Sequence, residues 1–326
     1  MKLYSNDVEA IDGLKNSYNI FSKEVAKVII GQDKIVRDIF ISILCRSHCL
    51  LIGVPGLAKT LMINTIASAL DLKYSRIQFT PDLMPSDIIG TEILDETRKF
   101  KFVKGPVFAN IILADEINRT PPNTQSALLE AMQEKTITVS GSKYTLEEPF
   151  FVLATQNPIE QEGTYPLPEA QLDRFMFSLW LDYPTFEQEL EIVKTTTSQQ
   201  FLSPEIALHR DDILYFQQLM LKIPVPEAVY QYAVKLISMT RPGNSNSHAW
   251  ANEYISWGAG PRASQFLILG AKSHAAIKGK YTPDIEDVKA VATAVLQHRI
   301  VRNYKAEAEN ISVNNIVEEL MKKDAF

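Results

Sequence analysis

Two short segments that are apolar at every position constrain the fold of this chain more than any other feature. They are Ile111–Ala114 and Phe151–Ala154. Strands that helices cover on both faces have this uninterrupted apolar character, so both segments are predicted to be central strands of a parallel sheet. Short apolar runs alternate with helical patterns around them, and five strands are expected: Cys49–Gly53, Tyr74–Phe79, Asn110–Asp115, Phe151–Gln156 and Met176–Leu181.

The pattern changes after residue 184, which predicts an α/β domain over 1–184 and a helical domain over 185–326. In the second part no further strand is expected. Segment 241–260 is rich in Gly, Asn and Ser but carries three large aromatic side chains, so it is interpreted as a long ordered loop. Six helices are predicted in the second part: Thr185–Gln199, Asp211–Lys222, Pro226–Thr240, Pro261–Lys278, Pro283–Arg299 and Ile311–Lys323.

Composition narrows the class of protein. Of 326 residues, 46% are hydrophobic and 22% charged, with a net charge of −6, as in ordinary globular proteins. The acidic balance argues against a surface for non-specific nucleic-acid binding. Cys45 and Cys49 are interpreted as small buried hydrophobes in a reducing compartment, and the histidines show no metal-binding spacing. No signal peptide or membrane-spanning stretch is visible, so a cytoplasmic protein without membrane insertion is expected.

A phosphate-binding loop is indicated where the first strand runs into a helical pattern. The rule asks for Gly, four residues, Gly, Lys and Ser or Thr, and the chain departs from it only at Ala58. Alanine is expected to serve there if its φ is negative. Lys59 is expected to reach the β- and γ-phosphates of a nucleotide and Thr60 to hold Mg²⁺. The alternative is an ordinary turn with a chance lysine. The residues expected to bind the nucleotide are Gly53, Val54, Pro55, Gly56, Leu57, Ala58, Lys59, Thr60 and Leu61.

Acidic and polar residues end two other predicted strands. Asp115 is expected to hold Mg²⁺, and Glu116 to orient and activate the attacking water, which favours hydrolysis over simple binding. The alternative is that both acids only begin a helix. Asn157 is expected to contact the γ-phosphate or the water, unless it is an Asn-Pro turn residue. Arg174 and Arg262 are candidates for stabilising the developing charge, although a single arginine is more often a solvated surface residue.

Beyond these motifs, the sequence resembles a MoxR-family AAA+ ATPase over about residues 28–300. The order of the matching segments is also the order expected for that family. They are Gly31-Gln32, Gly53–Thr60, Ala114–Pro122, Gln125–Glu134, Ala154–Pro158, Leu167–Phe175 and Gly258–Ala263. The run from 114 to 134 is highly specific, and Ala58 is itself common in the family.

The resemblance implies an αβα core with a five-stranded parallel sheet of order 5-1-4-3-2, a C-terminal all-helical lid, and ring assembly, usually hexameric. It implies that Ile30, Gly31 and Gln32 line the adenine pocket. It makes Lys59 and Thr60 part of Walker A, Asp115 and Glu116 Walker B, and Asn157 sensor 1. Arg174 resembles the arginine finger that enters the neighbouring subunit's site, Arg262 resembles sensor 2 on the lid, and Arg119 is expected to face the subunit interface.

Two inserted hairpins typical of this part of the AAA+ group are expected at about 89–107 and 135–149, and they are the expected substrate-facing parts. Polar and apolar residues alternate on either side of Gly141-Ser142, and this pattern alone predicts a hairpin. The chain departs from the family at Gly260, where a serine that could cap the following helix is expected. Ordinary surface hairpins are the alternative interpretation of both inserts.

The function expected is Mg²⁺-dependent ATP hydrolysis by a ring that remodels or activates protein partners, with ATP and Mg²⁺ as cofactors. Proteins of this family are associated with partners that carry von Willebrand factor A domains. A ring motor acting on nucleic acid is the first alternative, which the acidic charge disfavours. A nucleotide-binding scaffold with little turnover is the second. A guanine-nucleotide switch is disfavoured because no Asn-Lys pair occurs in the sequence.

Overall fold

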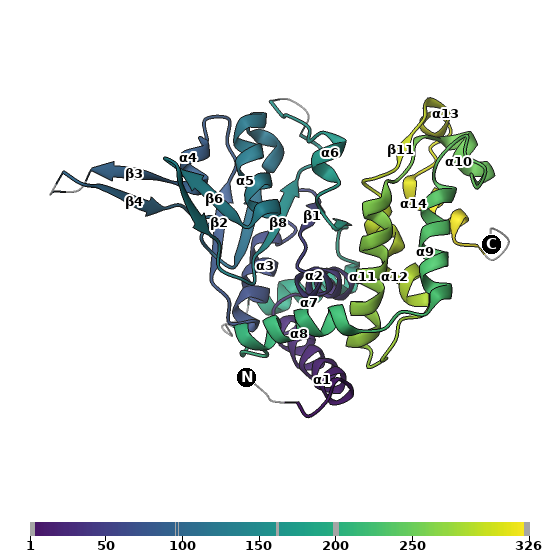
Figure 1. Ribbon diagram of the computed structural model, residues 1–326, viewed down its shortest axis with the longest axis horizontal. Coiled ribbons are helices and arrows are strands. Elements are labelled where there is room, and N and C mark those ends of the chain that lie inside the picture. The colour runs from purple at the N-terminus through teal and green to yellow at the C-terminus, as the bar shows by residue number, and fades with distance from the viewer. Residues whose placement is uncertain (1–3, 95, 97, 161–162, 198–201, 323–326) are drawn as a thin grey trace. The chain divides into compact units, whose positions relative to one another are not determined.

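The structure is a computed structural model that describes residues 4–94, 96, 98–160, 163–197 and 202–322 (Figure 1). Its main feature is a five-stranded sheet in which the strands lie in the order β2-β5-β8-β1-β9. These strands are β1 (Cys49–Ile52), β2 (Tyr74–Gln78), β5 (Ile111–Asp115), β8 (Phe151–Gln156) and β9 (Phe177–Trp180). Numbered among themselves, they have the order 5-1-4-3-2, which confirms the predicted fold class.

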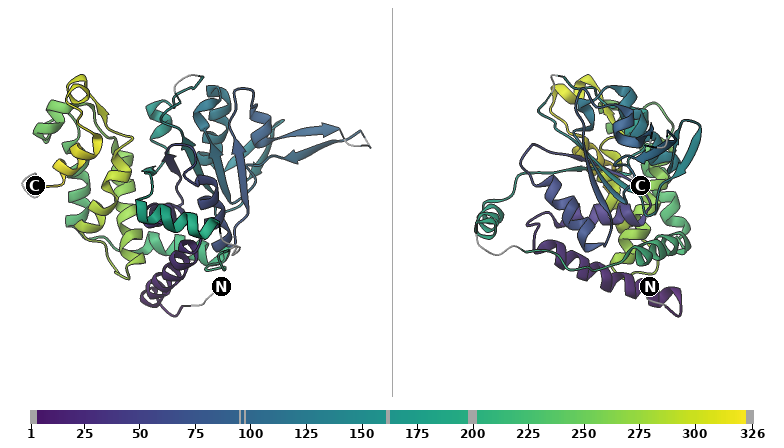
Figure 2. Two further views of the ribbon diagram at one scale, coloured as in Figure 1. Left: turned by 180° about the vertical axis from the view of Figure 1, so that it is seen from behind. Right: turned by 90° about the vertical axis from the view of Figure 1, so that its left-hand side faces the viewer.

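The register of the parallel strands explains why the two apolar runs are central. Ile111 pairs with Phe151 and Ala114 with Ala154, so the two runs are hydrogen-bonded to each other along their whole length. Every residue of β5, and all of β8 except Gln156, is buried. Figure 2 shows helices beside both faces of the sheet. Parallel strands in this position must be apolar on both faces.

The helices of the first half of the chain begin at favourable sequence signals in several places. Pro122 begins α5 with the fixed φ that suits the first helical position. Thr185 accepts a hydrogen bond from the main chain of Gln188 and so caps α7. The helical elements up to residue 197 are α1 (Asp7–Ala26), α2 (Asp33–Leu44), α3 (Lys59–Ala69), α4 (Pro85–Ile89), the 3₁₀ turn η1 (Ile117–Arg119), α5 (Pro122–Glu134), α6 (Glu169–Leu172) and α7 (Phe186–Thr196).

Two antiparallel hairpins occur in the segments where the sequence predicts inserts. β3 (Gly90–Leu94) pairs with β4 (Phe100–Lys104), and β6 (Thr136–Val139) pairs with β7 (Ser142–Thr145). The rings of Phe102 on β4 and Tyr144 on β7 stack with their centroids 4.1 Å apart. The two hairpins, far apart in sequence, therefore contact each other.

The chain divides into two compact units. The first comprises the described parts of 17–168 and 179–215, and the second comprises 4–16, 169–178 and 216–322. The predicted domains 1–184 and 185–326 do not coincide with these units. Residues 185–197 group with the first unit because α7 packs beside the phosphate loop, and a short segment before β9 groups with the second.

The second unit is mainly helical. Its later elements are α8 (Arg210–Lys222, shared with the first unit), α9 (Glu227–Met239), α10 (Ala249–Tyr254), β10 (Ile255–Trp257), α11 (Pro261–Ile277), α12 (Ile285–Leu296), β11 (Val301–Arg302), α13 (Tyr304–Ala308) and α14 (Val313–Leu320). None of the helices in the described part of the chain is both long enough and apolar enough to span a bilayer.

Two expectations for this unit were wrong. The expected loop at 241–260 contains helix α10 and strand β10, and Tyr254, the last residue of α10, is buried. Strands also do not stop after residue 184, since β10 pairs with β11 in an antiparallel ladder. Both elements are shorter than the patterns that periodicity detects, and they depend on pairing between residues far apart in sequence.

Candidate nucleotide site

The phosphate loop connects β1 to α3, as its sequence predicts. Gly56 has φ +88°, a conformation that glycine adopts without a Cβ penalty. The ammonium of Lys59 donates a 2.6 Å hydrogen bond to the main-chain oxygen of Gly53, so the lysine side chain folds back across the loop. In this position it closes the loop with its charge directed to the concave side.

Ala58 does not meet the condition of a negative φ under which alanine was expected to serve in the loop. Its φ is +53°, in the left-handed region, at the position immediately before α3. An L-residue in this region costs roughly 1–2 kcal/mol because its Cβ approaches a carbonyl oxygen. The loop therefore retains the backbone shape that glycine gives in the usual motif, and the alanine adopts that shape under strain.

The ends of three neighbouring strands meet beside the loop. The N–H of Gly53 donates to the carbonyl of Gln156 at the end of β8 (3.2 Å). Thr155 on β8 donates its hydroxyl to Asp115 Oδ1 (2.7 Å) and accepts from the N–H of Glu116 (2.9 Å). The register of β5 and β8 brings these residues together, and Thr155 is a site residue that the sequence motifs did not reveal.

Both acids of the expected Walker B pair accept hydrogen bonds from cationic or amide side chains. Asp115 Oδ2 accepts from Arg76 of β2 at 2.6 Å. Glu116 Oε2 accepts from Gln78 of the same strand at 2.9 Å and from Arg119 at 3.1 Å. Glu116 also has φ +58°, so its main chain is strained. Arg119, expected at a subunit interface, is thus paired with Glu116 within its own chain.

The charge of Lys59 is balanced by these acids. Burial of the half-buried side chain lowers its pKa, while the negative charges of Asp115, Glu116 and Glu160 act in the opposite direction. The charge of Lys59 and the charges of the two acids therefore influence one another. A cation facing two carboxylates at strand ends is suited to a ligand that carries both an anion and a metal ion.

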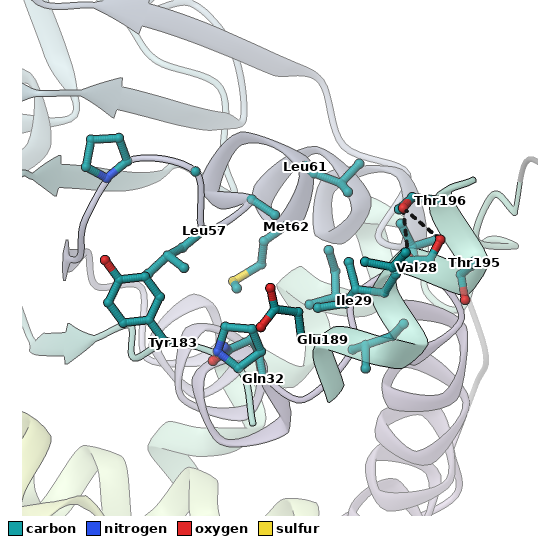
Figure 3. A pocket seen from close by; sticks show the side chains of 17 residues that line it. Val28, Ile29, Gln32, Leu57, Leu61, Met62, Tyr183, Glu189, Thr195 and Thr196 are labelled. Carbon is teal, nitrogen blue, oxygen red and sulfur yellow. Dashed lines mark hydrogen bonds between the residues drawn. The ribbon is translucent and has the colours of Figure 1, made fainter. Parts of the chain in front are cut away.

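An apolar pocket of about 420 Å³ lies beside the phosphate loop (Figure 3). Among the predicted nucleotide residues, those that line it are Ile30, Gln32, Pro55, Gly56, Leu57, Ala58 and Leu61. Sequence motifs missed the rest: Val28, Ile29, Met62, Tyr183, Pro184, Glu189, Ile192, Val193, Thr195 and Thr196. Most of these residues lie in α7 or in the segment between β9 and α7. The apolar residues of α7 were the only feature of the sequence that could have indicated them. The pocket has the size and apolar lining of a small-molecule site.

Gly31 does not itself line the pocket, but it fixes the chain at its rim. Its φ is +79°, and a Cβ built there would lie 2.4 Å from the Gln188 side chain of α7. The positive φ is what favours glycine here, since a Cβ would require only the end of the flexible Gln188 side chain to move. Gly53, Val54, Lys59 and Thr60 likewise belong to the loop without lining the apolar space.

Asn157, the predicted sensor, follows β8 and is buried. Its side-chain oxygen accepts a hydrogen bond from the N–H of Ile159 at 3.2 Å, which is the turn geometry considered as the alternative. The side-chain nitrogen is the group that could donate to a phosphate oxygen. The two interpretations are thus compatible, because one amide can make both bonds.

Arg174 and Arg262 lie in the second compact unit. Arg262 occupies the first turn of α11 and pairs with Asp173 at 2.9 Å. Arg174 follows Asp173 directly, in the turn between α6 and β9. The predicted sensor 2 therefore pairs, within this unit, with the residue that directly precedes the predicted finger.

The oxygen donors of Thr60 and Asp115 fit Mg²⁺, which prefers hard oxygen ligands and keeps several waters. Within the described ranges, no group of three or more His, Cys, Asp and Glu side chains is arranged to hold a metal ion. A site with one carboxylate and one hydroxyl matches the usual arrangement, in which nucleotide phosphates and water complete the coordination.

Comparisons with known proteins show the family of this chain. Residues 48–177 match the ATPase family associated with various cellular activities (AAA), and residues 247–320 match the AAA lid domain. Chaperone MoxR1 of Mycobacterium tuberculosis is 42% identical over 93% of this chain and 80% of its own. YeaC of Bacillus subtilis is 39% identical over 92% of this chain and 91% of its own.

A solved structure shows the same likeness. The crystal structure of a candidate ATPase from Cytophaga hutchinsonii aligns with a TM-score of 0.88 and 43% identity, covering 97% of this chain and 96% of that one. On these grounds, the chain belongs to the MoxR family of AAA+ ATPases.

Proposed function

We propose that this protein hydrolyses ATP with Mg²⁺ and couples the reaction to remodelling or activating protein partners. The observation that carries the proposal is the convergence of the phosphate loop, the acid pair and Asn157 at the ends of three adjacent strands. A binding scaffold would need the loop and the pocket alone. Glu116 beside the loop adds a base that hydrolysis requires.

The residues of the site have distinct roles in this proposal. Main-chain N–H groups of the loop and Lys59 would bind the β- and γ-phosphates, and the apolar pocket would hold adenine. Thr60 and Asp115 would hold Mg²⁺, which when bound supplies positive charge to the phosphate oxygens. Glu116 would orient and deprotonate the attacking water, and Asn157 would position it. For these roles Arg76 and Arg119 must yield the carboxylates that they hold.

The proposal extends to assembly. Arg174 acts as an arginine finger in the site of a neighbouring subunit, and Arg262 acts as sensor 2, so the protein works as a ring, with a hexamer as the expected size. The partner is a protein client, in the simplest case one with a von Willebrand factor A domain. The protein acts in the cytoplasm. Support comes from the family and from Chaperone MoxR1, named as a chaperone.

Paired variants of the two Walker motifs test the reaction. Glu116→Gln is expected to bind ATP with unchanged affinity and to lose about 10²–10⁴-fold in turnover, because only the base is removed. Lys59→Ala is expected to lose ATP binding itself. A fluorescent ATP analogue measures binding, and phosphate release measures turnover. Wild-type turnover in Glu116→Gln, or no turnover in the wild type at any concentration, would contradict the proposal.

A further inference from the structure

The last residues of α12 and the turn that follows bind the segment that carries Arg174. His298 Nε2 lies 3.0 Å from the carbonyl of Phe175, and the side-chain amide of Gln297 donates to the carbonyl of Ser178. Arg299 makes the most contacts. All of these residues belong to the second compact unit, so the contacts lie within one packed body.

Arg299 binds the main chain on both sides of Arg174. Its guanidinium donates to the carbonyl of Asp173 (2.9 Å), to that of Phe175 (2.7 Å) and to that of Met176 (3.2 Å). It also forms an ion pair with the Asp173 carboxylate at 2.7 Å. The main chain immediately before and immediately after Arg174 is therefore bonded to one planar group.

The surroundings of Arg299 make this arrangement rigid. The residue is only 7% exposed, and its guanidinium lies 5.0 Å from the centre of the Phe266 ring of α11. It also donates to the carbonyl of Val295 in α12 at 2.5 Å. A planar fork with fixed donors orders the groups that it binds, whereas a lysine ammonium acts as a point charge.

We infer that Arg299 is a positioning residue that fixes the main chain around Arg174 and so aims the Arg174 side chain at the neighbouring subunit. The inference rests on the proposed role of Arg174. Arg299 touches neither nucleotide nor metal in this account, and it acts only through the turn that it holds. Burying a charged side chain is costly, and here the carbonyls on both sides of Arg174 and the Asp173 carboxylate compensate that cost.

Subunit mixing tests the inference, because a finger acts in a neighbour's site. Arg299→Gln is expected to bind a fluorescent ATP analogue within about threefold of wild type and to lose roughly 100-fold in turnover, as misplacement of a catalytic group by about 1 Å does. Mixed with Lys59→Ala subunits, which keep their fingers, Arg299→Gln subunits should recover activity. Random head-to-tail assembly of equal amounts gives about a quarter of the wild-type turnover per chain.

Three variants serve as controls. Arg174→Ala mixed with Lys59→Ala must recover in the same way and reports on the finger itself. Arg302→Gln removes another arginine of this unit, one that donates to the carbonyl of Ile311, and should leave turnover unchanged. Arg299→Lys keeps the charge but loses the planar fork of donors, and it replaces Arg299→Gln in the mixing test if that variant does not fold.

The outcomes separate the inference from the proposed function. Turnover of Arg299→Gln alone within about threefold of wild type overturns the inference. Failure of Arg299→Gln to recover, while Arg174→Ala does recover, also overturns it but leaves the finger in place. Failure of both mixtures overturns the shared site and the inference with it. Recovery of both, with Arg302→Gln at wild-type turnover, establishes Arg299 as a residue that acts through Arg174.

Discussion

The two ends of the central sheet differ in how their polar groups are held: one end satisfies them with internal hydrogen bonds, and the other contains strained residues. At the amino ends of the strands, His48 accepts from the N–H of Val152 (3.1 Å), and its other ring nitrogen contacts the carbonyl of Met132 (3.2 Å). Asn110 is likewise bonded to main-chain groups on several sides. At the carboxyl ends lie two strained residues, Ala58 and Glu116.

This difference separates stability from function. The amino end contains neutral groups whose hydrogen bonds are satisfied by the protein itself, and such groups order a fold. The carboxyl end stores strain and holds carboxylates on exchangeable partners, as at Arg76, and such arrangements cluster at functional sites. Substitutions at the first end should therefore change the free energy of unfolding without changing turnover, whereas those at the second should change turnover or alter the strain stored there.

Within this comparison of the two ends, the largest effect on turnover is expected at Thr155, the residue that joins Asp115 and Glu116. Thr155→Val removes a donor to Asp115 and an acceptor for the Glu116 N–H while keeping the shape of the side chain. It should lower the free energy of unfolding by about 1–3 kcal/mol and turnover by at least about tenfold, since both acids lose their alignment. Thr155→Ser, which keeps the hydroxyl, is the matched control. Equal turnover in the two variants would show that Thr155 does not orient the acids.

At the amino end, His48 should make stability depend on pH. Burial lowers its pKa from the ordinary value of 6.5 to about 4, so the folded protein binds the proton less well than the unfolded chain. This contribution is present in full above pH 6.5 and decreases as the pH falls toward 4, by about 3 kcal/mol in total. Urea unfolding at pH 7 and pH 4.5 measures it.

His48→Gln is the control for this pH dependence, because glutamine can accept from Val152 and donate to Met132 without titrating. The difference in unfolding free energy between the two proteins should shift in favour of the variant as the pH falls. Turnover at pH 7.5 should be the same in both. If the unfolding free energies of the two proteins changed with pH in the same way, His48 would not be held neutral. A change in turnover would show that the amino end also affects function.

The smallest effect is expected at the phosphate loop. Ala58→Gly relieves a left-handed alanine and should raise the free energy of unfolding by up to about 1 kcal/mol, after the entropy that glycine costs in the unfolded chain. Gly56→Ala, with φ +88° and no atom within 4 Å of the added Cβ, should lower it by a similar amount. A destabilised Ala58→Gly protein would show that the loop is not strained there.

Sequence reasoning found the residues whose structure or role is determined by a local sequence pattern. The apolar runs of β5 and β8, and the phosphate loop after β1, each lie within one contiguous segment whose chemistry is visible in its composition. The condition of a negative φ at Ala58 is not met, although residue type alone favours the helical region. The loop geometry decides φ there, and it overrides that preference.

The residues that it missed depend on neighbours distant in sequence. Thr155 bonds to Asp115 40 residues away, and Arg76 bonds to the same carboxylate 39 residues away. Arg299 bonds to Asp173 across 126 residues. Strand register and helix packing create such pairs, and no short motif records them. Tyr183 and α7 line the pocket for the same reason, although the sequence had assigned α7 to another domain.

The central claim is that one active site needs two subunits, and ATPase activity per chain measured against protein concentration with Mg²⁺ tests it most directly. The account predicts that specific activity rises as chains assemble and that Arg174→Ala abolishes the rise, losing about 10³–10⁵-fold in turnover while still binding ATP. A specific activity that is constant with concentration and unaffected by Arg174→Ala would contradict the claim, because each chain would then hydrolyse ATP alone.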